Sequence, residues 1–402
     1  MKKRIMFVDD EPMILNGLRR SLHGMREIWD MQFVESAAAA LQALEKESYD
    51  AIISDMRMPS MDGADLLDQV KLRYPDTVRM ILSGQSSRGA VFRSIAPAHQ
   101  FLSKPCDPQE LATRLSQAFA MRDLLSNQSV KTVVSRLRSL PSLPALYEEV
   151  MAQLRSQDPS FQQIARIITK DVGMATKILQ LANSAFMGTS GRVSSLLQSL
   201  TLIGLDNVRT LVLSVNVFAQ FDGNARVAAS LPCLWDHSIA VSKLAQQIAA
   251  AENCPKALLE ECFTAGLLHD LGKLVLMAEF PKECLEVYTA RSDMNANVEG
   301  ERLGCTHAEV GAYLMSIWGL PFPLVHAVAY HHHPAETAET KFSTLTAVHA
   351  ADAIASEGDP SPFNHDTTLD QSYLDRLGLS ERESVWRSLL KGEPSSAAAR
   401  TN

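Results

Sequence analysis

Three carboxylates, Asp9, Asp10 and Asp55, stand where short apolar runs of the chain end. A further run ends at Ser83, and another is followed by Lys104. If these runs are parallel strands of one sheet, their carboxyl ends lie at the same edge, where sites form in open sheets. Clustered carboxylates repel one another, and a Mg²⁺ ion relieves that repulsion. We therefore predict Mg²⁺ at this edge, bound directly by Asp10 and Asp55 and through water by Asp9.

The chemistry expected of this site is phosphoryl transfer to Asp55. The cation screens the carboxylate, which can then attack a phosphoryl group and form an acyl phosphate. Lys104 would pair with one phosphoryl oxygen, and the Ser83 hydroxyl would donate a hydrogen bond to another. One Asp or Ser at a strand end is an ordinary turn former, so the prediction depends on the whole set.

The elements that must position these residues alternate along the first 125 residues. Runs typical of strands cover residues 5–8, 31–34, 51–54, 78–82 and 100–103. Helical patterns cover residues 13–22, 38–45, 65–72, 89–95 and 110–125. This alternation predicts an α/β doubly wound domain with a five-stranded parallel sheet covered on both faces.

This N-terminal domain resembles the receiver domains of two-component response regulators, which have a flavodoxin-like fold. The matching segments are residues 8–11, 54–63, 82–84 and 103–105. The resemblance implies that a sensor histidine kinase phosphorylates Asp55. It also implies that Ser83, Phe101 and Lys104 contact or respond to the phosphoryl group, with Phe101 as the switch aromatic.

A second set of candidate residues follows in the other half of the chain, where eight of the 11 histidines lie between positions 237 and 349. Imidazoles and carboxylates on separate helices can converge on a transition metal in a helical bundle. The residues in question are His237, His269, Asp270, His307, His331, His332 and Asp352. A lone buried histidine is more often a hydrogen-bonded core residue, and we assign that role to His326 and His349. We place His99 at the surface.

The order His, His-Asp, His, His-His, Asp resembles the HD phosphohydrolase superfamily. The resemblance implies that the seven residues are metal ligands and that Lys273 lies near a phosphate. In that superfamily the metals activate a water that attacks a phosphoester. The segment 333–336 lacks the Gly-Tyr-Pro signature of the members that cleave cyclic di-GMP, which argues against that substrate.

Residues 135–350 are more similar to HDOD domains, the HD-related output domains. The matching segments are residues 140–144, 171–186, 202–205, 266–272 and 318–321. HDOD domains are mostly regarded as regulatory modules without established catalysis, often fused to receivers. The resemblance implies an output that acts through protein partners or a bound ligand. The His/Asp set then has two interpretations, a working metal site or a polar core that an inherited site left behind.

Helical periodicity replaces strand signals beyond the receiver, which predicts an all-α HD-like output. We predict a receiver domain over 1–122, a connector helix over 123–138, an HDOD domain over 139–350, C-terminal helices over 351–385 and a disordered tail over 386–402. Phosphorylation would change the surface around Phe101, and helix 110–125 leads into the connector. The change could therefore reorient the output or create a homodimer.

Charge and composition limit the classes of partner and the compartment that we expect for this chain. The net charge of −8 lies entirely in residues 123–402, since the first 122 residues hold 16 basic and 16 acidic side chains. An acidic output half is a poor nucleic-acid surface, which disfavours a DNA- or RNA-binding regulator. No run approaches the ~18 apolar residues of a membrane span. Six scattered cysteines without a close pair fit reduced thiols in a cytoplasmic protein.

We therefore predict a cytoplasmic response regulator whose HDOD output acts on a downstream protein or through a ligand. The competing hypothesis is a metal-dependent HD phosphohydrolase that phosphorylation controls. Mg²⁺ in the receiver and a transition metal in the HDOD domain are the expected cofactors.

Overall fold

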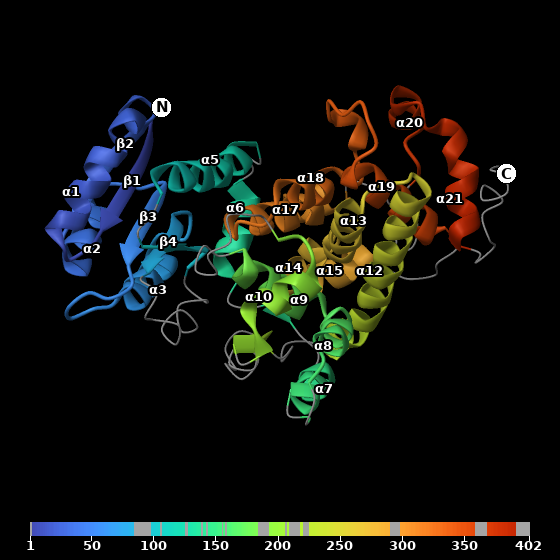
Figure 1. The fold of residues 1–402 in the computed structure, drawn as a ribbon, viewed down its shortest axis with the longest axis horizontal. Helices are drawn as coiled ribbons and strands as arrows, with labels where there is room; N and C mark the ends of the chain where they lie inside the picture. The colour runs from blue at the N-terminus through green and yellow to red at the C-terminus, as the bar shows by residue number, and fades with distance from the viewer. Residues whose placement is uncertain are drawn as a thin grey trace.

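The structure is a computed structural model of the 402-residue chain (Figure 1). It describes residues 2–83, 98–104, 107–124, 128–137, 140–141, 144–154, 156, 159–183, 193–205, 207–208, 218–219, 225–289, 298–357 and 368–390. No helix in these ranges is long and apolar enough to cross a membrane.

The N-terminal part is built on a parallel sheet in the order β2-β1-β3-β4-β5. The strands are β1 (Lys3–Val8), β2 (Trp29–Val34), β3 (Ala51–Asp55), β4 (Val78–Ser83) and β5 (Gln100–Ser103). The helical segments are α1 (Pro12–Ser21), the 3-10 turn η1 (His23–Glu27), α2 (Ala37–Lys46), α3 (Gly63–Arg73) and α5 (Pro108–Leu124). All of β3 is buried, as expected of a parallel strand covered on both faces.

Alternation along the strands sends side chains to two separate cores. Phe7 and Ile53 pack in a core with residues of α1 and α5. Met6 and Ile52 pack on the other face with residues of α2 and α3. The predicted class, a parallel α/β domain followed by a mostly helical part, is confirmed.

The helical part runs from α6 to α21. Its helices are α6 (Gln128–Arg136), α7 (Pro144–Leu154), α8 (Phe161–Ile168), α9 (Val172–Ala182), α10 (Leu196–Ile203), α12 (Ala225–Ala251), α13 (Lys256–Leu268), α14 (Leu271–Glu279), α15 (Pro281–Thr289), α16 (Val298–Leu303), α17 (His307–Ile317), α18 (Phe322–Tyr330), α19 (Thr344–Ser356), α20 (Gln371–Leu377) and α21 (Glu383–Leu390), with the 3-10 turns η3 (Pro334–Glu336) and η4 (Ser380–Arg382). One short parallel pair, β6 (Leu140–Pro141) with β7 (Phe218–Ala219), corrects the expectation that this half has no strands. A ladder of two residues is too short to leave a period in the sequence.

The tail predicted over 386–402 needs a correction at its start. Helix α21 extends to Leu390, and Trp386 is fully buried. The Trp386 indole N–H donates to Glu252 Oε1 at 2.8 Å, and Arg382 donates to the same oxygen. Because Glu252 lies 134 residues earlier, the local sequence carried no sign of this anchor. The other predicted domain boundaries remain predictions; α5 and α19 cross the ones at residues 122 and 350.

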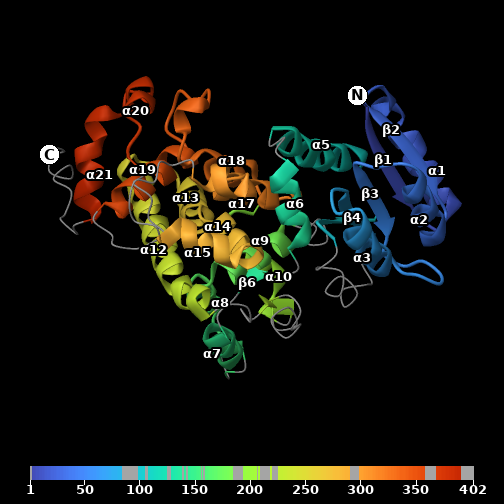
Figure 2. The same cartoon turned by 180° about the vertical axis from the view of Figure 1, so that it is seen from behind.

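The two parts of the molecule meet along α5, α6 and α17. Helix α17 packs against both α5 and α6. Figures 1 and 2, seen from opposite sides, both place α5 and α6 between the sheet and the remaining helices. The first residue of β5, Gln100, also lies against this helical part, because its side chain donates a hydrogen bond to the Ile317 carbonyl of α17.

Candidate functional site

The structure brings Asp9, Asp55 and Lys104 together at the carboxyl edge of the sheet. The Lys104 Nζ lies 2.7 Å from Asp9 Oδ2 and also forms an ion pair with Asp55 Oδ1. Asp9 is 1% exposed and Asp55 is 7% exposed, while the adjacent Asp10 is half-buried. Burial opposes the charge of Lys104, but hydrogen bonds with Asp55 and Asp9 outweigh it and raise the pKa of Lys104.

Local backbone holds the two carboxylates in place. The Glu11 N–H donates to Asp9 Oδ1 at 3.0 Å, and the Arg57 N–H donates to Asp55 Oδ2 at 2.8 Å. Gly63 starts α3 beside β3, where a Cβ would lie 2.1 Å from the Asp55 carbonyl oxygen. A larger residue at 63 would therefore displace strand β3, which carries Asp55.

Two predicted residues of this site can be placed only by their backbone. Ser83 ends β4, and Phe101 lies in β5 beside it. Their side chains fall outside the described parts of the structure, so their switch roles stay predictions.

The seven residues of the His/Asp set, although far apart in sequence, converge in one place. His237 lies on α12, His269 follows α13, and Asp270 precedes α14. His307 is the first residue of α17, and Asp352 lies on α19. His331 and His332 follow directly after α18. We call this group the His/Asp cluster.

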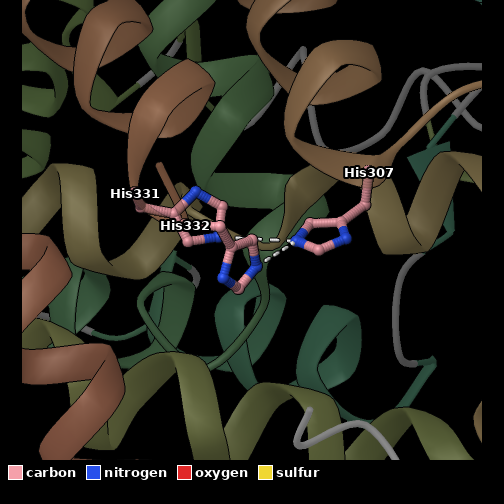
Figure 3. A group of neighbouring side chains, drawn as sticks. All are labelled: His307, His331 and His332. Carbon is pink, nitrogen blue, oxygen red and sulfur yellow. Dashed lines mark hydrogen bonds between the residues drawn. The ribbon is translucent and has the colours of Figure 1, made fainter. Parts of the chain in front are cut away.

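Distances within the His/Asp cluster match those between ligands of a shared ion. The His307 Nε2 lies 3.4 Å from His331 Nε2 and 3.0 Å from His332 Nε2, so that three rings from two elements point toward one another (Figure 3). The His307 Nε2 also lies 3.3 Å from Asp270 Oδ1. Three groups have ligand atoms within 4.8 Å of one another: His307, His331 and His332; His237, His269 and Asp352; and His269, Asp270 and His331. The geometry therefore fits one or two metal ions.

Hydrogen bonds outside the cluster fix which ring nitrogen faces inward. The Nδ1 of His269 lies 2.7 Å from the Gly266 carbonyl, and that of His331 lies 2.8 Å from the Val328 carbonyl. A carbonyl can only accept, so each Nδ1 carries the proton and each Nε2 presents a lone pair to the cluster. His307 also has its Nδ1 bonded outside the cluster, to Glu299. Its Nε2 lone pair and that of His331, 3.4 Å apart, repel each other unless a cation lies between them. This is the arrangement that metal-binding histidines adopt.

Several cluster atoms lack a hydrogen bond. Within the described parts of the chain, His269 Nε2, Asp270 Oδ1 and Asp352 Oδ2 are buried and have no hydrogen bond. Leaving such atoms bare costs free energy, and a metal would satisfy them. These orphaned atoms favour a metal site over a self-sufficient polar core.

The ionisation of His331, His332 and Asp270 suits a cation; at His237 burial opposes the charge, but the hydrogen bond with Asp352 outweighs it and raises the pKa. Burial lowers the pKa of His331 to about 3, with His269 next in effect, and burial also lowers the pKa of His332. Burial opposes ionisation of Asp270, but His269 and Lys273 outweigh it and hold the pKa of Asp270 well below its usual range. Metal ligands must be neutral imidazoles and ionised carboxylates, which is what the shifts of His331, His332 and Asp270 produce.

Glu299 on α16 belongs to the site and was missed from sequence. Its Oε2 accepts from the His307 Nδ1 at 2.7 Å, and its Oε1 accepts from the Tyr288 hydroxyl at 2.7 Å. Although burial opposes its charge, His307 lowers the pKa of Glu299 to about 2. Nothing in the sequence separates Glu299 from the nearby Glu301, since no pattern marks a residue that orients a ligand. Lys273, the predicted phosphate contact, donates to Asp270 Oδ2 at 2.8 Å.

Glycines let the helices that carry the His/Asp cluster come into backbone contact. A Cβ on Gly266 of α13 would lie 2.8 Å from Ser242 Cα of α12. A Cβ on Gly272 of α14 would lie 1.9 Å from the His307 carbonyl oxygen and 2.9 Å from the Gly311 nitrogen. Backbone contact at these positions brings His269 and Asp270 within reach of the residues on α12 and α17.

Three other histidines test the assignment to core or surface. His349 is buried; its Nδ1 lies 2.7 Å from the His331 carbonyl and its Nε2 accepts from the Asp370 N–H, which confirms a core role. His326 corrects the expectation of a buried core residue, because it is partly exposed and lies 3.5 Å from Glu339. His99 corrects the expectation of a surface residue, because it is partly buried against the Arg79 guanidinium.

Comparison with protein families divides the chain in two. The model of the response regulator receiver domain matches residues 5–116. The model of the HDOD domain matches residues 140–334. The first match contains Asp9, Asp55 and Lys104, and the second contains all of the His/Asp cluster except Asp352.

Individual relatives match parts of this chain. An uncharacterized protein of Treponema pallidum is 26% identical over 209 residues, which cover 50% of this chain and 39% of that protein. The response regulator protein PilR of Pseudomonas aeruginosa is 30% identical over 162 residues, covering 40% of this chain and 36% of PilR. The chain therefore spans less than two thirds of either relative. Among solved structures, the MmoQ response regulator of Methylococcus capsulatus is 25% identical, with a TM-score of 0.47, over 62% of this chain and 98% of that one.

Proposed function

This chain is a response regulator in which an HDOD domain follows a receiver domain, and we propose that phosphorylation of Asp55 controls an HDOD output that binds a transition metal. The receiver implies a phosphodonor such as a histidine kinase. The downstream target in this proposal is a protein that recognises the HDOD surface. The observation that carries the metal proposal is the set of buried cluster atoms without hydrogen bonds.

At the receiver, the proposed step is attack by an Asp55 oxygen on phosphorus. The new bond to Asp55 forms as the bond between phosphorus and the donor's nitrogen breaks. Lys104, already paired with Asp55, would follow a phosphoryl oxygen, and its positive charge would offset the added negative charge. Mg²⁺, held by Asp9, Asp10 and Asp55, would neutralise further charge when bound.

In the HDOD domain, the donor set fits a borderline transition metal such as Zn²⁺, Mn²⁺ or Fe²⁺. The imidazoles of His307, His331 and His332 form one group, and His237, His269 and Asp352 form another. Asp270 lies between them, 3.5 Å from His269 and 3.3 Å from His307. The Asp270 carboxylate would therefore help to hold a metal in either group.

The burial of the cluster supports a regulatory role over hydrolysis. Catalytic metal sites keep a position open for water or substrate, whereas structural sites are closed. The side chains of His237, His269, Asp270, His307 and Asp352 are at most 4% exposed, and that of His332 is 18% exposed. Lys273 is itself tied to Asp270 and buried. A phosphoester would have to approach past His332.

Phosphohydrolase activity is the second candidate, and Lys273 favours it. A buried ammonium 2.8 Å from a metal-ligating carboxylate would lie near a phosphate bound to that metal. Turnover of a simple phosphoester by the metal-loaded chain, lost on Lys273→Met with metal retained, would select this alternative.

Metal content of the purified full chain tests the main proposal. After incubation with Mn²⁺, Fe²⁺ or Zn²⁺, we expect about one or two equivalents in the wild type and none in a His269→Ala/Asp270→Ala variant that keeps its helical circular dichroism. His326→Ala, which changes a histidine outside the cluster, is the matched control and should retain full metal. A wild type without metal would identify the cluster as a polar core and overturn the proposal.

A further inference from the structure

Among the residues that the structure describes, three hydrogen bonds join the receiver to the HDOD domain, and each ends on a main-chain carbonyl. The Gln100 side chain donates to the Ile317 carbonyl at 3.1 Å. In the opposite direction, the Gln180 side chain donates to the His99 carbonyl at 3.3 Å. The Arg114 guanidinium of α5 donates to the Asn183 carbonyl at 3.0 Å. Because these contacts hold main-chain atoms, a movement of β5 in the receiver would displace helices of the HDOD domain.

Gln100, like Gln180, is one of the two buried donors among the three. It is 3% exposed, and it lies at the start of β5, the edge strand of the sheet. Gly319, in the turn after α17, has a φ of +74°, and a Cβ there would lie 3.0 Å from Gln100 Cδ. Both the conformation and the space require glycine at 319. The end of α17 and the start of β5 are therefore in close contact.

Strand β5 reaches the phosphoacceptor at its other end. Lys104 follows its last residue, Ser103, and pairs with both Asp9 and Asp55. Phosphorylation of Asp55 changes the charge that Lys104 faces and so pulls on the end of β5. The strand is short and bonded along β4, which favours movement as a unit.

Helix α17 reaches the His/Asp cluster in the same way. The Ile317 carbonyl accepts from Gln100 at one end, and His307 enters the cluster at the other. A helix of this length is about 16 Å long and transmits displacement along its axis. Because Gly272 and Gly311 place the backbones of α14 and α17 in contact, α14 and the preceding Asp270 must follow α17.

We propose that β5 and α17 form one linkage, joined at Gln100 and Ile317, through which Asp55 phosphorylation alters the His/Asp cluster. This linkage rests on the proposed function, because it is the path by which phosphorylation of Asp55 would control the HDOD domain. It differs from transmission through α5 and the connector because it predicts a specific dependence on Gln100. By linkage, metal in the cluster must also change the phosphorylation equilibrium at Asp55 by the same factor.

The first measurement is Co²⁺ binding by the full chain, followed by visible absorption. Titrations are compared with Mg²⁺ alone and with Mg²⁺ plus beryllofluoride, a mimic of the phosphoryl group on Asp55. In the wild type we expect the Co²⁺ dissociation constant to change by about fivefold or more. In Gln100→Ala the change should fall to less than about twofold, with Co²⁺ binding itself retained. Gln109→Ala, which changes an exposed glutamine of α5, should behave as the wild type.

The second measurement is hydrogen exchange of α17 under the same two conditions, which does not need a metal. Beryllofluoride should change the exchange of α17 amides in the wild type and in Gln109→Ala, and not in Gln100→Ala. If Co²⁺ fails to bind at all, the proposed metal function is lost, while the exchange result still decides the linkage. A response that persists undiminished in Gln100→Ala, or no response in the wild type, would overturn the linkage.

Discussion

The carboxylate site of the receiver and the His/Asp cluster satisfy their buried polar groups in opposite ways. In the receiver, a cation built into the chain, Lys104, pairs with Asp9 and Asp55. In the HDOD domain, Lys273 pairs with Asp270, but the Nε2 lone pairs of His307 and His331 still face each other across the cluster. The receiver site balances its charges with Lys104 and needs no bound group at rest. The opposed lone pairs of the cluster are unsatisfied, and they favour a permanently bound metal.

The largest effect that separates the two sites is expected at Asp55. Asp55→Asn removes the nucleophilic carboxylate, so labelling by acetyl phosphate with Mg²⁺ should be abolished. Metal content of the HDOD domain should stay at the wild-type level, because Asp55 lies outside the cluster. Labelling is measured by intact mass.

Asp65→Asn is the matched control for this loss, since Asp65 is an exposed residue of α3. It should be labelled as the wild type is. Undiminished labelling of Asp55→Asn would place the phosphoacceptor elsewhere, and the carboxylate site of the receiver would not be the site of phosphorylation.

The next largest effect concerns Glu299, which orients His307. Glu299→Gln keeps the shape of the side chain but removes the charge that accepts from the Nδ1 and main-chain N–H groups of His307. Loss of such a partner typically costs about 10- to 100-fold in metal affinity, and we expect that loss here. Competition with a metallochromic chelator measures it.

Glu301→Gln is the control on the same helix, at an exposed position. It should bind metal as tightly as the wild type. Equal affinity of Glu299→Gln and wild type would mean that His307 is held by packing alone and is not tuned by its carboxylate.

The two sites also differ in how far the sequence could predict them. Asp9, Asp55 and Lys104 each directly follow or end a strand, so strand ends and the parallel sheet were enough to bring them together. The His/Asp cluster needs α12, α13, α17, α18 and α19 to converge, and periodicity does not say which helices meet. Its members could be named only because their order resembles a known family.

The residues that could not be found from the sequence act through hydrogen bonds to distant parts of the chain. Glu299 acts through His307, and Gln100 acts through a main-chain carbonyl more than 200 residues away in sequence. Neither belongs to a motif: Glu299 bonds a histidine ring on another helix, and the bond from Gln100 to a backbone carbonyl sets no requirement on the partner's side chain. Trp386 was placed in a tail because its partner Glu252 lies on another helix, far away in sequence.

The smallest expected effect lies at the junction of the two domains, at Lys177 of α9. Its Nζ donates to Gln180, which in turn donates to the His99 carbonyl of the receiver, and it lies 4.1 Å from the Trp318 ring centroid. Burial lowers the pKa of Lys177 to about 7, and the nearby Lys71 adds to the effect. An unfolded lysine has a pKa of about 10.4.

The sign of the resulting pH dependence follows from proton counting. Between about pH 7 and 10.4 the unfolded chain binds a proton that the folded chain does not, so the free energy of unfolding rises with pH across this window. Below about pH 7 the full cost of burying the charge remains. Lys177→Met should therefore gain most in stability near neutral pH and gain little at high pH. Urea denaturation of the full chain at several pH values measures this difference, with Lys243→Met, an exposed lysine of α12, as the control. If the gain from Lys177→Met were the same at pH 7 and pH 10, Lys177 would be charged in the folded protein, and the junction would hold its ammonium without neutralising it.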